Sequence, residues 1–263
     1  MARTIQQLFD LTGKTALVTG GSRGLGLQMA HALGEAGARI MVTSRKAEDL
    51  EQAVAQLQAA GIDARWIAAD CAKESEIKRL ADETLERMGN VDILVNNAGA
   101  AWGAPAEDHP IDAWDKVMNL NVRGYFILSQ IIAKKSMIAR RSGRIINVAS
   151  IAGLGGNPPE MTTIAYNTSK GAVINFTRTL GAEWGKYNIT VNAICPGFFP
   201  SKMTMGTLAA MGEEKLAAHA PLGRLDDDED LKGLCLLYAS DAGKHITGQW
   251  LAVDGGVSVV TGG

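Results

Sequence analysis

The feature of this sequence that most constrains its fold is a regular alternation of short β-branched runs with longer amphipathic stretches. Seven runs predict buried strands, at residues 15–18, 38–43, 65–68, 92–95, 144–149, 189–193 and 250–253. Helical patterns lie between most of them, at about residues 24–36, 47–60, 111–139, 164–184 and 231–239, with a Glu- and Lys-rich helix after the third strand. Parallel strands need such crossovers, and right-handed crossovers place helices on both faces of the sheet. The sequence therefore predicts an α/β fold with a doubly wound, seven-stranded parallel sheet.

No linker, internal repeat or low-complexity segment interrupts this alternation, so we expect one domain over residues 1–263. A chain of 263 residues that is 46% hydrophobic can build one sizeable core. The net charge of -2 gives no electrostatic reason to bind nucleic acid or an anionic membrane. The sequence shows neither the apolar core of a signal peptide nor an apolar run of about 18 residues, which a membrane span needs. We expect a cytoplasmic protein.

Metal and disulfide chemistry are not indicated. The three cysteines are odd in number and far apart, and the four histidines are not in a metal-ligand spacing. An acidic run at residues 226–230 could suggest a cation site. It directly precedes the helix expected at 231–239, and carboxylates at a helix N-terminus explain it better.

A glycine-rich segment follows the first predicted strand and opens the first helix. Gly20, Gly24 and Gly26 allow a tight turn and a close backbone approach at a helix N-terminus, which is what a bound pyrophosphate requires. The spacing is Gly-x-x-x-Gly-x-Gly rather than the common dinucleotide pattern, and a purely structural turn is the alternative. Its position in a βαβ unit favours a dinucleotide. The remaining expected contacts of this turn are Ser22, Arg23 and Leu25.

The end of the second strand predicts which dinucleotide is bound. An acidic residue there accepts from the ribose of NAD, whereas an arginine accommodates the 2′-phosphate of NADP. Here Ser44, Arg45 and Lys46 follow the strand and the first acid is Glu48, so we expect NADP(H) to be preferred and NAD(H) to be possible. The alternative is a solvated helix start. Later strand ends supply further expected cofactor contacts: Asp70, Cys71, Asn97, Ala98 and Gly99.

A candidate catalytic pair lies on the helix expected at 164–184. Tyr166 and Lys170 are four residues apart, so they share one helix face. A lysine beside a tyrosine favours the phenolate, and we expect it to lower the pKa of Tyr166 toward a range useful for proton exchange. The pair alone is a weak signal, since an exposed helix carrying an amphipathic tyrosine has the same pattern.

Together these motifs resemble those of the short-chain dehydrogenase/reductase family, over essentially the whole chain. The matching segments are residues 19–26, 96–99, Asn121, Ser150, Tyr166-x-x-x-Lys170, Pro196-Gly197 and 246–256. Within this family, the sequence most resembles 3-oxoacyl-carrier-protein reductase-like and gluconate 5-dehydrogenase-like members. The resemblance implies one Rossmann-like domain, assembled as a homotetramer or a dimer.

The resemblance also implies residue roles. Tyr166 would be the general acid in carbonyl reduction and the base in alcohol oxidation, with Lys170 lowering its pKa and bonding the nicotinamide ribose. Ser150 would donate to the substrate oxygen, and Asn121 would hold a water of the proton relay. The segment at 194–201 would contact the nicotinamide carboxamide, through Pro196, Gly197, Phe199 and Ser201.

The substrate is the least determined feature. Ser150 and Tyr166 are 16 positions apart, a few more than in many bacterial members, and the turn-rich segment 153–163 should border the substrate. A fairly apolar pocket is expected, lined by Trp102, Ser150, Phe198, Met203 and Met205. We favour reduction of a ketone such as a 3-oxoacyl thioester. The alternatives are a sugar-acid or polyol dehydrogenase and, more remotely, a non-catalytic nucleotide-binding scaffold.

Overall fold

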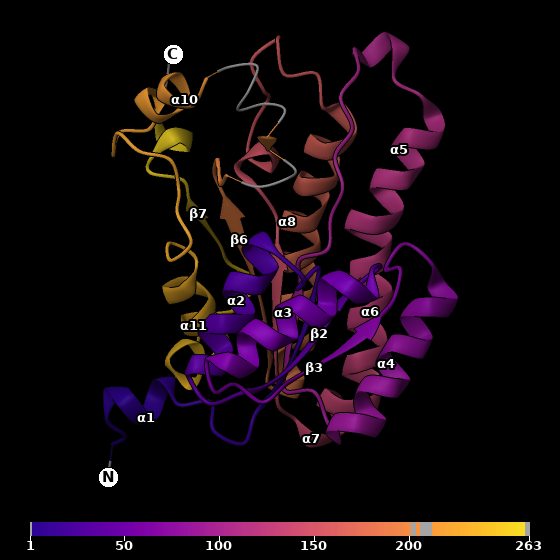
Figure 1. Cartoon of the computed structure of the whole chain (residues 1–263), viewed down its shortest axis with the longest axis vertical. Helices are drawn as coiled ribbons and strands as arrows, with labels where there is room; N and C mark the ends of the chain where they lie inside the picture. Colours follow the sequence, from indigo (N-terminus) through magenta and orange to yellow (C-terminus); the bar gives the residue numbers. More distant parts are fainter. Residues whose placement is uncertain (1, 201–203, 206–211, 261–263) are drawn as a thin grey trace.

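One parallel sheet of seven strands organises the chain (Figure 1). The computed structural model describes residues 2–200, 204–205 and 212–260. The strand order is β3-β2-β1-β4-β5-β6-β7, and every neighbouring pair is parallel. The strands are β1 (Thr15–Thr19), β2 (Arg39–Ser44), β3 (Ala64–Ala68), β4 (Ile93–Asn96), β5 (Gly143–Val148), β6 (Ile189–Pro196) and β7 (Trp250–Val253). The predicted α/β fold with a seven-stranded parallel sheet is confirmed.

Helices connect the strands as expected, with ends that differ by a few residues from the prediction. They are α1 (Ile5–Phe9), α2 (Gly24–Glu35), α3 (Ala47–Ala59), α4 (Glu74–Met88), α5 (Ile111–Met118), α6 (Gly124–Ile132), α7 (Ile138–Arg140), α8 (Ile164–Trp184), α10 (Glu213–His219) and α11 (Lys232–Ala239). The short α1 and α10 were not predicted, because neither is long enough to show a periodic pattern. Among the described residues, no helix is both long and apolar enough to cross a membrane.

The helix expected at 111–139 is continuous but not uniform. Two π-helical turns, η2 (Asn119–Arg123) and η3 (Ala133–Met137), separate α5, α6 and α7. A π-turn inserts one residue into the helix and rotates the side chains that follow it. Sequence periodicity does not reveal such an insertion. The first of the two turns contains the candidate site residue Asn121.

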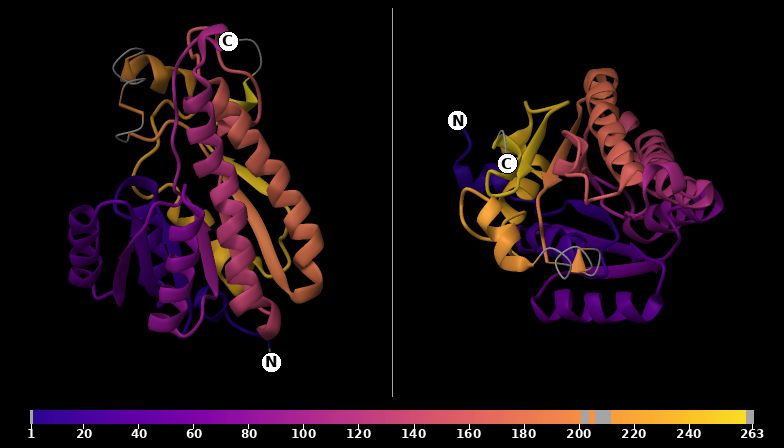
Figure 2. Two further views of the ribbon diagram at one scale, coloured as in Figure 1. Left: turned by 90° about the vertical axis from the view of Figure 1, so that its right-hand side faces the viewer. Right: turned by 90° about the horizontal axis from the view of Figure 1, so that it is seen from above.

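Alternate strand residues pack into hydrophobic cores on opposite faces of the sheet. Ala16 and Val18 of β1 point to the face covered by α2, α3 and α11, whereas Leu17 points to the face covered by α4, α6 and α8. All three are fully buried, as expected for a parallel strand between two helical layers. Figure 2 shows α5–α6 and α8 as long helices lying side by side. The catalytic candidates of α8 are therefore held on a helix that packs along the sheet.

Four buried polar side chains fasten two of these helices to the sheet. Asn96 donates from Nδ2 to Ser129 Oγ of α6 and to Asn147 Oδ1 of β5, both at 2.9 Å. Asn147 Nδ2 donates in turn to Thr177 Oγ1 of α8, also at 2.9 Å. Buried amides and hydroxyls cost free energy when they are left unpaired, so this network fixes the two helices in register with the strands.

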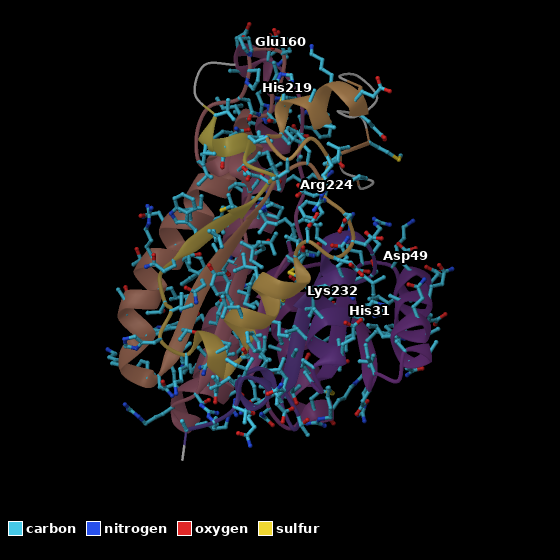
Figure 3. The ribbon with its side chains drawn as sticks, turned by 90° about the vertical axis from the view of Figure 1, so that its left-hand side faces the viewer. His31, Asp49, Glu160, His219, Arg224 and Lys232 are labelled. Carbon is cyan, nitrogen blue, oxygen red and sulfur yellow. The ribbon has the colours of Figure 1, made fainter. Side chains whose placement is uncertain are left out.

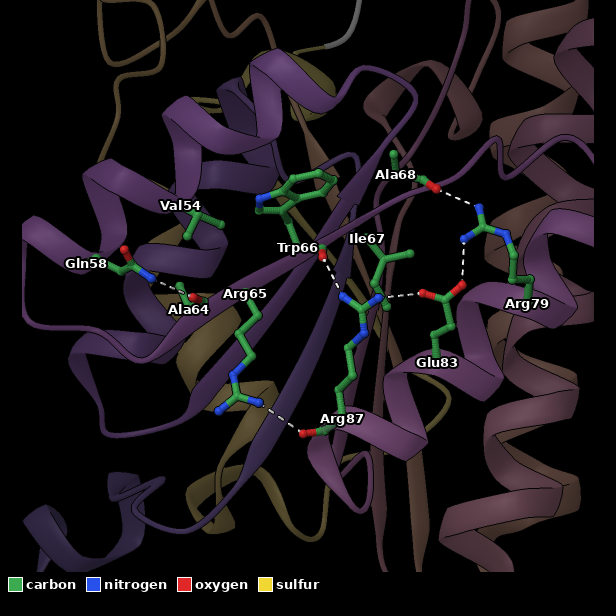
Figure 4. Close-up of a pocket in the computed structure, with 10 residues that line it drawn as sticks. All are labelled: Val54, Gln58, Ala64, Arg65, Trp66, Ile67, Ala68, Arg79, Glu83 and Arg87. Carbon is green, nitrogen blue, oxygen red and sulfur yellow. Dashed lines mark hydrogen bonds and ion pairs between the residues drawn. The ribbon is translucent and has the colours of Figure 1, made fainter.

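The free edge of β3 is closed by side chains, as Figure 4 shows. Since strand residues alternate, the carbonyls of Ala64, Trp66 and Ala68 face away from β2. Each accepts a side-chain hydrogen bond, from Gln58 of α3 at 3.0 Å, Arg87 of α4 at 3.4 Å and Arg79 of α4 at 2.6 Å. Both arginines also contact Glu83 at 2.8 Å, which holds them against the edge. These contacts occupy the acceptors that another strand would use.

We expect replacement of both Arg79 and Arg87 by alanine to promote self-association, because two edge carbonyls then become free to pair with another chain. Light scattering during mild heating measures this, and we expect aggregation several-fold faster than in the unmodified chain. The matched control is Arg65→Ala, since Arg65 lies in the same depression but donates to the Arg87 carbonyl of α4. Equal aggregation of the double variant and the control would contradict this role of the edge.

Candidate active site

The candidate site lies where the order of the strands reverses. The chain leaves β1 toward β2 on one side, whereas it leaves β4 toward β5 on the other side. The connections after these two neighbouring strands therefore run in opposite directions. Ligands of doubly wound sheets bind at such a point. Here the buried hydroxyl of Thr19, the last residue of β1, accepts hydrogen bonds from the N–H groups of Asn97 (2.9 Å) and Ala98 (3.0 Å).

The glycine turn is packed tightly against this junction. Gly20 has a φ of +65°, which a residue with a side chain rarely adopts. A Cβ at position 26 would lie 2.3 Å from the carbonyl oxygen of Gly20, so only glycine fits there. Asn97 Nδ2 donates to the carbonyls of Thr19 (2.9 Å) and Gly20 (3.2 Å) and fixes the turn. The turn runs into α2, and it places Ser22, Arg23, Gly24 and Leu25 at or before the first helical turn.

Polar groups without hydrogen-bond partners among the described residues lie at the end of β2. The hydroxyls of Thr43 and Ser44 are buried and have no hydrogen-bond partner among the described residues. Arg45 and Lys46 follow directly, and both are exposed. Arg23 was expected as a further cation, but its guanidinium pairs with Asp49 of α3 at 3.1 Å. Two hydroxyls and two cations are groups that suit the sugar and phosphate of a dinucleotide, and these contacts stay a prediction.

Asp70 and Cys71 differ in how available their side chains are. Asp70 Oδ1 accepts from the N–H of Ala72 at 3.0 Å and turns the chain toward α4. Cys71 is buried, and burial raises the pKa of its thiol to about 12. The thiol is therefore protonated and packs as an apolar group, so only the Asp70 part of the predicted pair presents a polar side chain to a cofactor.

Tyr166 and Lys170 lie one turn apart on α8, as predicted. The Lys170 Nζ is 5.5 Å from the centre of the Tyr166 ring and donates to the carbonyl of Val148 at 2.7 Å. The lysine is 3% exposed, and burial lowers its pKa to about 8. The expected fall in the pKa of Tyr166 is wrong for the chain alone. Burial raises that pKa, and a hydrogen bond from the Ser150 hydroxyl opposes the rise.

Ser150 and Asn121 complete the group from two other segments. Ser150 follows β5, is buried, and accepts from the N–H of Ala152 at 3.2 Å in η4 (Ile151–Gly153). Asn121 is fully buried and commits both hydrogens of its amide, to the carbonyl of Ala100 and to Ser169 Oγ, each at 2.9 Å. A Cβ on Gly99 would lie 3.4 Å from Asn121 Oδ1 and 3.8 Å from Lys170 Nζ. Gly99, in the loop after β4, therefore lies close to both Asn121 and Lys170.

The segment after β6 is held in place by its backbone. Gly197 donates its N–H to the carbonyl of Val253 at 2.8 Å, which holds Pro196 and Gly197 against β7. Phe199 stays a predicted cofactor contact through its backbone, because its side chain is buried in the core that contains α2 and α11. Phe198 is half-buried. Ser201 and Met203 lie outside the described residues.

The remaining candidates for the substrate pocket are largely exposed. Met205 is 62% exposed and Trp102 is 42% exposed. The ammonium of Lys116 lies 5.8 Å from the centre of the Trp102 ring. Neither side chain is enclosed in the chain alone.

The acidic run does not cap a helix as predicted. Helix α11 begins at Lys232 and has no acidic residue in its first turn. Instead Arg224 bonds both carboxylate oxygens of Asp230, at 2.6 and 2.7 Å. Burial, with the neighbouring carboxylates of Asp230 and Asp254, raises the pKa of Asp226 to about 7. In the described part of the chain, no cluster of three or more His, Cys, Asp or Glu side chains could hold a metal.

Several residues that organise the site gave no recognisable signal in the sequence. Thr19 and Ser169 lie inside two of the matching segments, but the sequence did not indicate the hydrogen bonds that they form with distant segments. Asn157, in the loop before α8, is a third example.

Comparisons with known proteins agree with this geometry. The family model described as short chain dehydrogenase matches residues 14–212. A rhamnolipid-biosynthesis 3-oxoacyl-[acyl-carrier-protein] reductase from Pseudomonas aeruginosa is 39% identical over 252 residues, which are 94% of this chain and 97% of that protein. Gluconate 5-dehydrogenase from Gluconobacter oxydans is 35% identical over 253 residues, 96% of this chain and 97% of that protein.

Solved structures give the same result. A gluconate 5-dehydrogenase from Burkholderia cenocepacia, in complex with NADP and tartrate, has a TM-score of 0.92 and 34% sequence identity. The similarity covers 98% of this chain and 100% of that one. With a family model that matches most of the sequence and relatives aligned along almost all of it, the chain belongs to the short-chain dehydrogenase/reductase family of NAD(P)-dependent oxidoreductases.

Proposed function

We propose that this chain is an NADPH-dependent reductase that converts a ketone to a secondary alcohol, reversibly, in a single NAD(P)-binding catalytic domain. The observation that carries the proposal is the meeting of Tyr166, Lys170, Ser150 and Asn121 beside the glycine turn. A bound nicotinamide cofactor would supply the hydride. The chain itself must then hold the carbonyl and deliver a proton to its oxygen.

The burial of these groups suits them to that task. Tyr166 stays protonated in the chain alone, because burial raises its pKa, and it can therefore donate a proton to a carbonyl oxygen. Ser150 bonds Tyr166 and stabilises negative charge on the substrate oxygen. Lys170 holds a buried ammonium beside the tyrosine ring, which favours the phenolate after the proton has left. Asn121, with its amide committed, fixes the loop that contains Ala100.

The preference for NADP(H) over NAD(H) rests on the end of β2. Arg45 and Lys46 form no hydrogen bond or ion pair through their side chains within the described chain, and two buried hydroxyls beside them are unpaired. Such cations suit a 2′-phosphate, and no carboxylate directly follows the strand to accept from a free ribose. The similar structures from Burkholderia cenocepacia and Pseudomonas aeruginosa both contain NADP.

A 3-oxoacyl thioester or another apolar ketone is the substrate class that we favour. The 39% identical relative is named a 3-oxoacyl-[acyl-carrier-protein] reductase, and the half-buried Phe198 lies near the end of β6. Oxidation of a sugar acid or polyol is the second candidate. It is favoured by relatives named gluconate 5-dehydrogenase, one of which holds the hydroxy acid tartrate.

We also propose that copies of the chain assemble as a homotetramer or a dimer. Phe126, stacked edge-on against Phe176 of α8, is 47% exposed, and Leu251 of the edge strand β7 is 51% exposed. Exposed apolar side chains on two long helices and on a sheet edge suit burial against another copy. Light scattering that reports a monomer would contradict this assembly.

The direct test of the substrate class is an NADPH-oxidation screen with 3-oxoacyl thioesters, cyclic and aryl ketones, and keto-sugar acids. We expect the thioesters to give the highest kcat/KM, because an acyl chain gains from apolar contacts that a sugar acid cannot make. A preference for 5-keto sugar acids would support the second candidate and contradict the first. If none of these compounds is turned over, both candidate substrate classes are wrong.

We expect Arg45→Ala to raise KM for NADPH about tenfold and to leave KM for NADH almost unchanged, because only the phosphate gains a charge-assisted hydrogen bond from the guanidinium. Initial rates with both cofactors measure the change. Lys78→Ala is the control, since this exposed cation of α4 pairs with Glu74. Equal changes for NADPH and NADH in Arg45→Ala would show that the residue does not select the cofactor.

A further inference from the structure

The loop that joins Ser150 to Tyr166 is pinned to α8 at both of its ends. At its start, Gly153 approaches α8 so closely that a Cβ would lie 2.6 Å from the carbonyl carbon of Lys170. At its end, residue 163 leads directly into α8, which begins at Ile164. The loop is exposed between these points, and Figure 3 shows its Glu160 at the upper end of the molecule, the same end as His219 of α10.

A single asparagine side chain holds the second half of this loop together through hydrogen bonds. Asn157 Nδ2 lies 2.9 Å from Thr163 Oγ1, 3.1 Å from Asn167 Oδ1 and 3.4 Å from the carbonyl of Met161. Thr163 Oγ1 in turn donates to Asn167 Oδ1 at 2.8 Å. Asn167 directly follows Tyr166 on the first turn of α8. The three side chains, Asn157, Thr163 and Asn167, form a cluster that we name the loop clamp.

The backbone beside Thr163 of the loop clamp also holds a second loop. The carbonyl of Thr162 accepts the N–H of Ala104 at 2.9 Å, and Ala104 pairs with Thr163 in an isolated parallel bridge. Ala104 belongs to the loop after β4, which also contains Ala100. The backbone N–H and carbonyl of Ala100 are both bonded by Asn121, at 2.8 and 2.9 Å. A continuous series of contacts therefore runs from Asn121, through the two loops, to the residue after Tyr166.

We propose that Asn157 is a positioning residue for the substrate, because it locks these two loops into one wall beside Tyr166. The inference rests on the proposed ketone reduction. A small ketone reaches the catalytic hydroxyls without touching this wall, whereas a substrate with a long chain must extend past it. The loop clamp therefore determines how well long substrates bind, and the proton transfer itself does not depend on it.

Two variants loosen the clamp in different ways. Asn157→Ala removes the amide that gathers the loop, and Thr163→Val removes the bridging hydroxyl with little change in shape. Thr190→Val is the matched control. The Thr190 hydroxyl is buried without a partner among the described residues, and it lies at the start of β6, where Thr190 pairs with Arg144 of β5.

Hydrogen exchange at the amide of Ala104 tests the clamp without any need for activity. This amide is bonded across the two loops, so we expect its exchange to be about tenfold faster in Asn157→Ala and in Thr163→Val, with Thr190→Val unchanged. Unchanged protection of Ala104 in both clamp variants would overturn the proposal.

Kinetics test the consequence for the substrate. With NADPH, we compare acetoacetyl and 3-oxodecanoyl thioesters of N-acetylcysteamine. Both clamp variants should raise KM for the long thioester about fivefold, while kcat for both thioesters and KM for the short one stay within about twofold. A matched loss of kcat on both thioesters would overturn the positioning role. If the unmodified chain reduces neither thioester, the proposed thioester substrate class is wrong, and the exchange of Ala104 still decides whether the clamp exists.

Discussion

The hydroxyl of Thr19 is the interaction on which the candidate site depends. It is buried at the end of β1, where the strand order reverses, and it accepts the N–H groups of both Asn97 and Ala98. Asn97 then uses its side chain to hold the carbonyls of Thr19 and Gly20. The glycine turn and the loop after β4 are thus fixed by one small cluster. The segments expected to bind the cofactor and the catalytic residues are therefore both positioned relative to the end of β1, which fixes their arrangement.

The burial of Lys170 explains much of the site's electrostatic character. An ammonium that is 3% exposed loses hydration, which lowers its pKa to about 8, and the carbonyl of Val148 replaces only part of the lost solvent. The polar network of Asn96, Asn147 and Thr177 holds β5 and α8 in register beneath it. A packed and hydrogen-bonded support of this kind keeps the reacting side chains in place before a substrate arrives.

The sequence predicted the strands, the covered sheet and the place of Tyr166 and Lys170, because strand and helix periods report burial directly. It did not predict what depends on contacts between distant segments. The π-turn that contains Asn121, the burial of the Phe199 side chain and the ion pair between Arg23 and Asp49 are of this kind. The pKa of Tyr166 is the clearest case. The sequence spacing showed that a lysine lies beside Tyr166 and favours the phenolate. The burial of Tyr166, which raises its pKa, appears only in the fold.

The central claim is that Tyr166 supplies the proton for ketone reduction, and Tyr166→Phe tests it most directly. The measurement is kcat for NADPH-dependent reduction together with the Kd for NADPH, with Tyr187→Phe as a control in the turn that follows α8. The account predicts that kcat falls about 10²- to 10⁴-fold in Tyr166→Phe while NADPH still binds within about twofold of the unmodified Kd. Unchanged turnover in Tyr166→Phe would contradict the account.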